Sequence, residues 1–170
     1  ESLITTAKDH FGKVDVTFLN AGVMPVTPLS ALEVDRWVQT VNINLIGVMY
    51  GIASVLPTFK EQGGGQIITT SSLAGLSPYP GVAAYCATKF GVRALMESLQ
   101  MESAQEKNHI RTTTIYPGAV ATNLMKNSGN DSSQAQFNKM LPEQVANAVV
   151  YAIDQPESAS VESITVRANS

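Results

Sequence analysis

Apolar residues recur along the chain in two alternating patterns, one typical of helices and one typical of strands. Helical spacing predicts helices at residues 2–11, 30–59, 83–107 and 142–154. Short runs rich in β-branched and aromatic residues predict strands at residues 14–19, 66–70, 110–116 and 163–167. Strands separated by helices favour right-handed crossovers and a parallel sheet covered on both faces. We therefore expect one α/β domain spanning residues 1–170.

Three predicted strand ends carry unusual residues. Asn20-Ala21-Gly22 follows the first strand, Ser71-Ser72 the second and Pro117-Gly118 the third. The carboxyl ends of parallel strands open onto one crevice, where ligands bind. Farther along, the polar stretch 123–139 predicts a loop, with residues 127–133 as its most mobile part.

Composition narrows the classes of function. Apolar residues make up 44% of the chain, charged residues 15%, and the net charge is −3. Without a basic run, a nucleic-acid binder is not expected. Apolar stretches such as 41–50 are interrupted by Asn and too short to span a bilayer, so we expect a cytoplasmic protein. The single Cys86 and two isolated histidines predict no metal site and no internal disulfide.

Tyr85 and Lys89 are the first candidates for chemistry. They are four residues apart in a predicted helix, so they share one face. A nearby ammonium favours the phenolate, although lowering a tyrosine pKa from about 10 to about 7 requires roughly 4 kcal/mol. An isolated pair of this kind is usually structural. Ser72, thirteen residues upstream at a strand end, strengthens the hypothesis of a proton-transfer site.

Five segments together resemble the short-chain dehydrogenase/reductase family in order and spacing. They are Phe18-Leu19-Asn20-Ala21-Gly22, Asn44-Leu45-Ile46-Gly47, the run Gln66 to Gly75, Tyr85-Cys86-Ala87-Thr88-Lys89, and Tyr116-Pro117-Gly118-Ala119-Val120-Ala121-Thr122. The resemblance covers essentially the whole chain. It implies a Rossmann-like doubly wound parallel sheet and an NAD(P)-dependent enzyme that interconverts an alcohol and a ketone or aldehyde by hydride transfer.

The resemblance also implies residue roles. Tyr85 is the general acid/base, Ser72 polarises the substrate carbonyl, and Lys89 binds the nicotinamide ribose and lowers the Tyr85 pKa. Asn44 is placed at a distortion of its helix, where it helps to hold a water that links Lys89 to solvent. Ser71 replaces Ser72 if the register slips by one residue. Cys86 is interpreted as a small packing residue.

Further residues are implied for the cofactor, which is NADP or NAD with NADP favoured. Asn20 and Ala21 line the adenosine side, Gly22 lets the backbone approach the cofactor closely, and those around the nicotinamide are Pro117, Gly118, Val120 and Thr122. The ending 162–167 resembles members that act with NADP on small hydroxy acids and carbonyls. The family also implies a homodimer or homotetramer through the two long helices, with a small-molecule alcohol or carbonyl as the other partner.

One family element is absent from the sequence. Complete members begin with further strands and the glycine-rich turn Thr-Gly-x-x-x-Gly-x-Gly, which holds the pyrophosphate. We therefore expect the chain to represent the C-terminal part of such a domain, without those first strands and that turn. The competing interpretation is a non-catalytic relic that acts as an interaction or dimerisation module. The intact Asn, Ser, Tyr and Lys set favours the enzyme.

Overall fold

Four parallel strands form one sheet in the order β1-β2-β3-β4. The computed structural model describes residues 2–126 and 138–169. The strands are β1 (Val16–Leu19), β2 (Gly65–Thr70), β3 (Ile110–Pro117) and β4 (Ser163–Val166). Every neighbouring pair is parallel, and Leu19 lies opposite Thr69 while Thr70 lies opposite Ile115. The strand ends after β1, β2 and β3 therefore meet at one edge.

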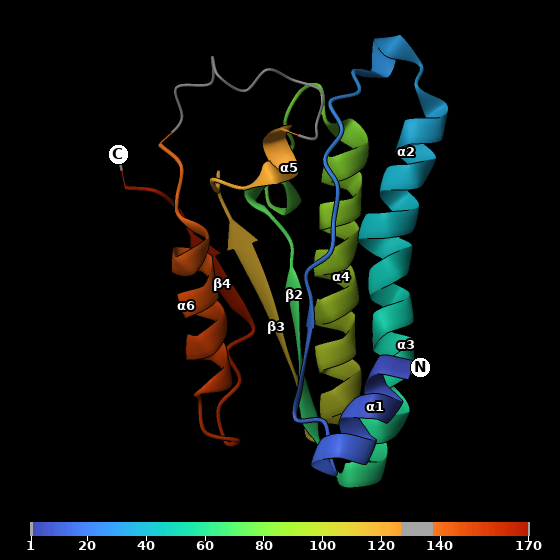
Figure 1. Ribbon diagram of the computed structural model, residues 1–170, viewed down its shortest axis with the longest axis vertical. Coiled ribbons are helices and arrows are strands. Elements are labelled where there is room, and N and C mark those ends of the chain that lie inside the picture. The colour runs from blue at the N-terminus through green and yellow to red at the C-terminus, as the bar shows by residue number, and fades with distance from the viewer. Residues whose placement is uncertain (1, 127–137, 170) are drawn as a thin grey trace.

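Helices cover both faces of this sheet (Figure 1), as the pattern predicts. The α-helices are α1 (Ser2–Phe11), α2 (Val34–Val41), α3 (Gly47–Gln62), α4 (Ala83–Glu106), α5 (Asn123–Lys126) and α6 (Pro142–Ile153). Two 3₁₀ turns, η1 (Leu29–Ala31) and η3 (Leu73–Gly75), and one π-helical turn, η2 (Asn42–Ile46), complete the helical elements. In Figure 1, α3 and α4 lie on one side of the sheet and α6 on the other, which is the doubly wound arrangement.

Each side of the sheet has its own apolar core. The core beneath α3 and α4 includes Val55, Phe59, Ile67, Val92 and Met96, all almost completely buried. The core beneath α6 is smaller and is built from Ile68, Ile115, Val149 and Ala152. Ile67 and Ile68 are adjacent in β2 and point to opposite faces, because side chains alternate along a strand. A continuous apolar run in β2 is thus what a strand buried on both faces requires.

The predicted helix 30–59 differs from the structure in its start and in its middle. Leu32 adopts a left-handed conformation with φ of 52°, so the helix begins only at Val34. The π-helical turn η2 then interrupts the α-helical pattern between α2 and α3. At the other end, α3 continues to Gln62 and stops where Gly63 takes φ of 82°, a left-handed C-terminal cap that glycine adopts without strain. The loop predicted at 127–133 falls outside the described residues.

The expectation that every apolar segment is too short to span a membrane is wrong, because one helical run is long enough. Residues Val34–Gln62 form one helical run of 29 residues, and an 18-residue window of it has a mean hydropathy of 1.4, so by length and composition alone it could cross a membrane. The stretch 41–50 covers only the middle of this run, because α3 continues to Gln62. Packing offers a different account of these apolar residues, since Val48, Ile52, Val55 and Phe59 lie in the core against the sheet.

Candidate active site at the carboxyl edge of the sheet

The turn after β1 and the end of β2 are joined by a side-chain hydrogen bond. The Thr70 hydroxyl donates to Asn20 Oδ1 at 2.8 Å. This bond lies at the carboxyl edge, where Ser71 and Ser72 also leave β2. The structure therefore brings together the first two of the three strand ends that the sequence singled out.

Tyr85 and Ser72 meet at this edge. Tyr85 lies in the first turn of α4 and is 6% exposed. Ser72 precedes η3 in an extended conformation, and its Oγ accepts a hydrogen bond from the Ala74 amide at 3.1 Å. That bond uses the oxygen as an acceptor and leaves the hydroxyl proton free to be donated. Ser72 is also close enough to Tyr85 for a side-chain hydrogen bond to affect the phenol.

The pKa of Tyr85 is shifted in the direction opposite to the expected one. Burial raises it above its ordinary value of 10.0, the hydrogen bond with Ser72 lowers it in part, and Cys86 raises it. The positive charge of Lys89 does not reverse this shift. Its Nζ lies 5.6 Å from the centroid of the Tyr85 ring, over the ring face, and donates to a different acceptor. In this structure desolvation therefore outweighs the cationic effect that the spacing suggested.

Lys89 spans the gap between α4 and the end of β2. Its Nζ donates to the Thr70 carbonyl at 2.7 Å. The Lys89 residue is almost fully buried, at 5% exposed, and no carboxylate of residues 2–126 and 138–169 forms an ion pair with it. Burial alone lowers the pKa of Lys89 from 10.5 to about 8. A cation held in this way retains two N–H donors for further acceptors.

Asn44 lies in the π-helical turn η2 and is completely buried. Its Nδ2 donates to the Val23 carbonyl at 2.8 Å, and its Oδ1 accepts from the Val23 amide at 2.8 Å. A third, longer bond runs from Nδ2 to Thr88 Oγ1 at 3.2 Å. The distortion expected at this residue is present, and π-turns often mark functional sites. Both Nδ2 donors of Asn44 are used by protein groups, and its Oδ1 accepts one bond from the Val23 amide.

The two adjacent serines have separate partners. Ser71 is buried and donates to the backbone carbonyl of Lys89 at 3.0 Å, whereas Ser72 faces Tyr85. The register that the thirteen-residue gap selected is therefore the one in which Ser72 approaches the phenol. Cys86, expected to pack, is buried, and its Sγ accepts from the Tyr79 amide at 3.3 Å.

Glycines make room at both sides of the edge. A side-chain carbon on Gly22 would lie 3.2 Å from Asn44 Oδ1 and 3.7 Å from Lys89 Nζ. A side-chain carbon on Gly118 would lie 3.3 Å from Leu73, and the Gly118 amide donates to the Val166 carbonyl at 2.9 Å. The backbone at residue 22 thus approaches Lys89 closely, as a groove for an extended ligand requires.

The other residues implied for the cofactor follow these glycines. Ala21 is exposed after β1, and Pro117 ends β3 as a buried residue. Val120 forms an isolated bridge with Met140, and the Thr122 hydroxyl accepts a bond from the Leu124 amide at 3.4 Å, at the start of α5. The segment 117–122 therefore connects the end of β3 to α5 at the same edge of the sheet (Figure 1).

Sequence reasoning missed Thr70 and Thr88. Thr88 donates to the Tyr85 carbonyl at 2.7 Å and receives the bond from Asn44, so it links η2 to the first turns of α4. Thr70 supplies the carbonyl for Lys89 and the hydroxyl for Asn20. Backbone acceptors leave no trace in a sequence, but the hydroxyl residue beside Lys89 was a signal that could have been considered.

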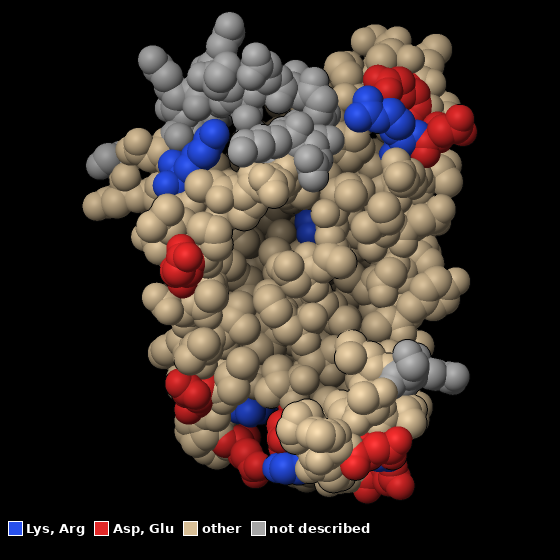
Figure 2. All heavy atoms as spheres, viewed as in Figure 1, with Lys and Arg blue, Asp and Glu red and all other residues tan. Residues whose placement is uncertain are grey.

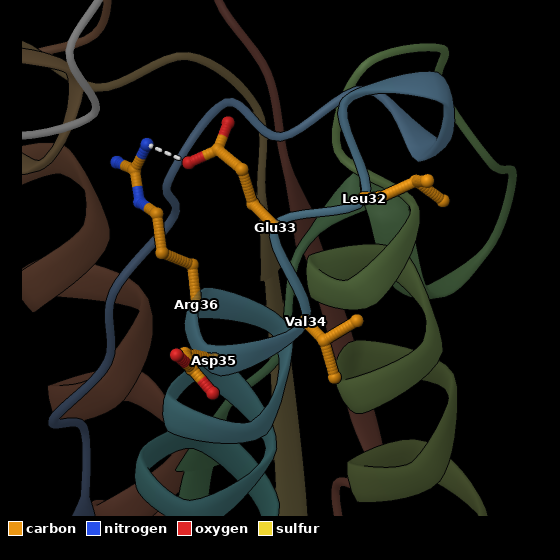
Figure 3. A pocket seen from close by; sticks show the side chains of 5 residues that line it. All are labelled: Leu32, Glu33, Val34, Asp35 and Arg36. Atoms are coloured by element: carbon orange, nitrogen blue, oxygen red, sulfur yellow. Dashed lines mark hydrogen bonds and ion pairs between the residues drawn. The ribbon is translucent and has the colours of Figure 1, made fainter.

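The face seen in Figure 2 is hollowed in its middle, and most of its acidic and basic side chains lie near the two ends. A separate open hollow of about 310 Å³ is lined by residues 32–36 at the start of α2. It contains the ion pair in which Arg36 Nη1 approaches Glu33 Oε2 at 2.9 Å (Figure 3). None of the candidate site residues lines this second hollow. Across residues 2–126 and 138–169, no cluster of three potential metal ligands occurs.

Fold and site together define a Rossmann-like α/β protein with a Ser, Tyr and Lys set at the carboxyl edge. The family model described as short chain dehydrogenase matches residues 1–133. An uncharacterized oxidoreductase of Listeria monocytogenes is 51% identical over 98% of this chain and 69% of its own length. The chain belongs to the short-chain dehydrogenase/reductase family and is an oxidoreductase of that family.

Solved structures agree with this assignment. An alcohol dehydrogenase of the archaeon Thermococcus sibiricus, in complex with 5-hydroxy-NADP, is 26% identical with a TM-score of 0.82, over 97% of this chain and 67% of that one. A serine dehydrogenase of Escherichia coli is 25% identical with a TM-score of 0.81, over 97% of this chain and 68% of that one.

Proposed function

We propose that this chain takes part in NAD(P)-dependent interconversion of an alcohol and a ketone or aldehyde, with Tyr85 as the general acid/base. The observation that supports this most directly is the convergence of Ser72, Tyr85 and Lys89 at the carboxyl edge of the sheet. Ser72 comes from the residue before η3 and the other two from α4, yet Ser72 affects the Tyr85 phenol and Lys89 lies over its ring.

The protonation state of Tyr85 suits carbonyl reduction. Because burial raises the pKa of Tyr85, the phenol is protonated across the physiological range and is able to donate its proton to a carbonyl oxygen. The Ser72 hydroxyl, whose oxygen accepts from Ala74, would donate its proton to the same substrate oxygen in place of the Tyr85 phenol. Alcohol oxidation requires the phenolate, which a second cation near the Tyr85 oxygen would stabilise.

Several residues suit a nicotinamide cofactor, which supplies or accepts the hydride when bound. Lys89 has two donors to offer to ribose hydroxyls, and Gly22 keeps the space beside its Nζ open. Asn20, Ala21 and Gly22 would line the adenosine side, whereas Pro117, Gly118, Val120 and Thr122 would lie around the nicotinamide. NADP is favoured over NAD because the T. sibiricus relative was solved with an NADP derivative and because the ending 162–167 resembles NADP-linked members.

The substrate is proposed to be a small or medium alcohol or carbonyl compound, including small hydroxy acids. The similarity to the E. coli serine dehydrogenase supports the small hydroxy acids. Next to Tyr85, the residues Met24, Ala74 and Val82 pack together as an apolar wall. Such a wall suits the carbon skeleton of the substrate, while Ser72 and Tyr85 supply its polar contacts.

Tyr85→Phe in the full-length protein tests the proposal. Oxidation of NADPH and NADH is followed with a panel of ketones, aldehydes and small oxo acids. Loss of the proton donor is expected to lower kcat about 10²–10⁴-fold, the usual contribution of general acid/base catalysis. Tyr151→Phe, which alters an exposed tyrosine on α6, is the control and should retain the parental rate. A Tyr85→Phe enzyme as fast as its parent would contradict the mechanism, and a parent without turnover would favour the non-catalytic interpretation.

We also propose a homodimer or homotetramer. Large apolar side chains remain exposed along the helical run from α2 to α3 and on α4, namely Val34, Val38, Met49, Tyr50, Phe90 and Met101. Exposed apolar patches of this kind commonly mark protein contacts. The mass in solution, measured by sedimentation at micromolar concentration, distinguishes an oligomer from a monomer.

A further inference from the structure

Ser71 is a buried serine for which neither the family resemblance nor the proposed chemistry requires a role. It is 2% exposed and lies between Thr70 and Ser72 as the chain leaves β2. Its hydroxyl donates to the Lys89 carbonyl on α4 at 3.0 Å. Inside helix α4 that carbonyl also accepts a helical backbone hydrogen bond. The bond from Ser71 is therefore an additional one, and it connects α4 to the end of β2.

The neighbouring residue holds the other end of Lys89. The Thr70 carbonyl accepts from Lys89 Nζ at 2.7 Å. Two consecutive residues, Thr70 and Ser71, therefore hold Lys89 at its ammonium and at its backbone carbonyl. A lysine side chain has four rotatable bonds, and fixing both ends removes much of its freedom.

Gly75 makes this arrangement sterically possible. A side-chain carbon on Gly75 would collide with Ser71 Oγ and would lie 2.8 Å from the Lys89 carbonyl oxygen. The 3₁₀ turn η3, which carries Ala74 and follows Ser72, can therefore approach α4 closely. Shortening this approach brings the Ser72 end of η3 and the first turns of α4 into register, which is the geometry the proton-transfer site needs.

We propose that Ser71 is a positioning residue that acts through Lys89: with the Thr70 carbonyl it forms a two-point clamp that holds the ammonium beside the Tyr85 ring. The effect of the clamp on turnover rests on the function proposed above, whereas its effect on Lys89 does not. Ser71 does not touch substrate or cofactor in this proposal.

Another buried serine on the same helix provides a matched control. Ser103 is 4% exposed and its hydroxyl donates to the Ile110 carbonyl at 2.7 Å, which is the same type of bond between α4 and a strand. Ile110 begins β3, so this bond lies at the opposite edge of the sheet from Lys89. Ser103→Ala and Ser71→Ala both remove a buried hydroxyl that bonds to the backbone, but only Ser71→Ala removes one of the two points at which Lys89 is held.

The first experiment uses the cofactor-free, full-length protein with ¹³C-labelled lysine. The Cε resonance of Lys89, identified by its absence in Lys89→Arg, is followed against pH. In the parent its midpoint reports the low pKa that burial imposes, about 8. In Ser71→Ala we expect the midpoint to rise toward 10.5, because a released side chain reaches more water. Ser103→Ala should keep the parental midpoint. An unchanged midpoint in Ser71→Ala would overturn the clamp.

The second experiment compares steady-state kinetics of the same variants. Ser71→Ala is expected to lower kcat about tenfold and to raise KM for the nicotinamide cofactor, whereas Ser103→Ala keeps both near the parental values. Parental kinetics in Ser71→Ala would overturn the positioning role, whatever the resonance does. If the parent itself shows no turnover, the proposed function fails, and the Lys89 midpoint still decides whether Ser71 and Thr70 form a clamp.

Discussion

Lys89→Met is expected to remove most of the rise in stability of this protein between neutral and alkaline pH. The parent buries an ammonium whose only acceptor among the described residues is the Thr70 carbonyl. Burial lowers the pKa of Lys89 from 10.5 to about 8, which means that the folded state binds the Lys89 proton less tightly than the unfolded state does. Methionine has a similar length and no charge, so it fills the same space without desolvating a cation.

The sign and size of the effect follow from proton linkage. Below pH 8 both states carry the proton, and the folded state bears the full cost of about 3 kcal/mol, at roughly 1.4 kcal/mol per pKa unit. Between pH 8 and 10.5 the folded state loses the proton first, so stability rises with pH. Linkage gives a gain of about 2 kcal/mol from roughly pH 7 to pH 9.5. Tyr85 opposes this only above its ordinary pKa of 10.0, because its pKa in the folded state is raised and its stabilisation is lost there.

The assay is urea unfolding of the cofactor-free protein at fixed concentration, followed by circular dichroism at several pH values. The difference between pH 9.5 and pH 7 is the quantity to compare, because the constant cost of leaving the Thr70 carbonyl without its donor cancels. Lys60→Met, which removes a surface lysine paired with Glu106 at 2.7 Å, should keep the parental pH dependence. Parallel curves for Lys89→Met and the parent would refute the reasoning, since the ammonium would then impose no burial cost.

The remaining predictions concern η2 and the exposed apolar face. Asn44→Ala is expected to destabilise the fold by about 2–4 kcal/mol, because the Val23 amide and carbonyl lose their partners. Urea unfolding measures this, and a loss below about 0.5 kcal/mol would contradict it. Val38→Glu places a charge on the exposed face of α2 and is expected to shift sedimentation toward the monomer, while an unchanged mass would exclude that face from the contact.

The fold could be predicted because its strands are short, β-branched and bounded by glycine, proline or serine. Residues 66–70 read as a strand and form all but the first residue of β2, and residues 110–116 form all but the last of β3. The π-helical turn could not be predicted by periodicity, since a shift of one residue hardly changes an apolar stripe. The left-handed Leu32 was also hidden, because leucine is not a residue that signals positive φ.

The residues of the site could be predicted from the sequence, but their contacts could not. The order and spacing of Asn44, Ser72, Tyr85 and Lys89 followed from motifs, and the structure places all four around the carboxyl edge of the sheet. The partners of Lys89 and Asn44 are largely backbone groups, at Thr70 and Val23, and a backbone amide or carbonyl has no identity in a sequence. The role of Ser71 was hidden for the same reason.

The pKa of Tyr85 shows that a nearby cation does not by itself set the direction of a pKa shift. Spacing of four residues places Lys89 one helical turn from Tyr85, and at that level a lowered pKa was a reasonable hypothesis. The direction of the shift depends on where the Lys89 ammonium lies relative to the Tyr85 ring and on how far both groups are buried. The ammonium lies over the ring face, 5.6 Å from its centroid, and both residues are almost completely buried. Desolvation therefore acts on both at once, raising the pKa of Tyr85 and lowering that of Lys89. Each shift favours the neutral form of the side chain, so the Tyr85 phenol keeps its proton, which is the protonation state that carbonyl reduction requires.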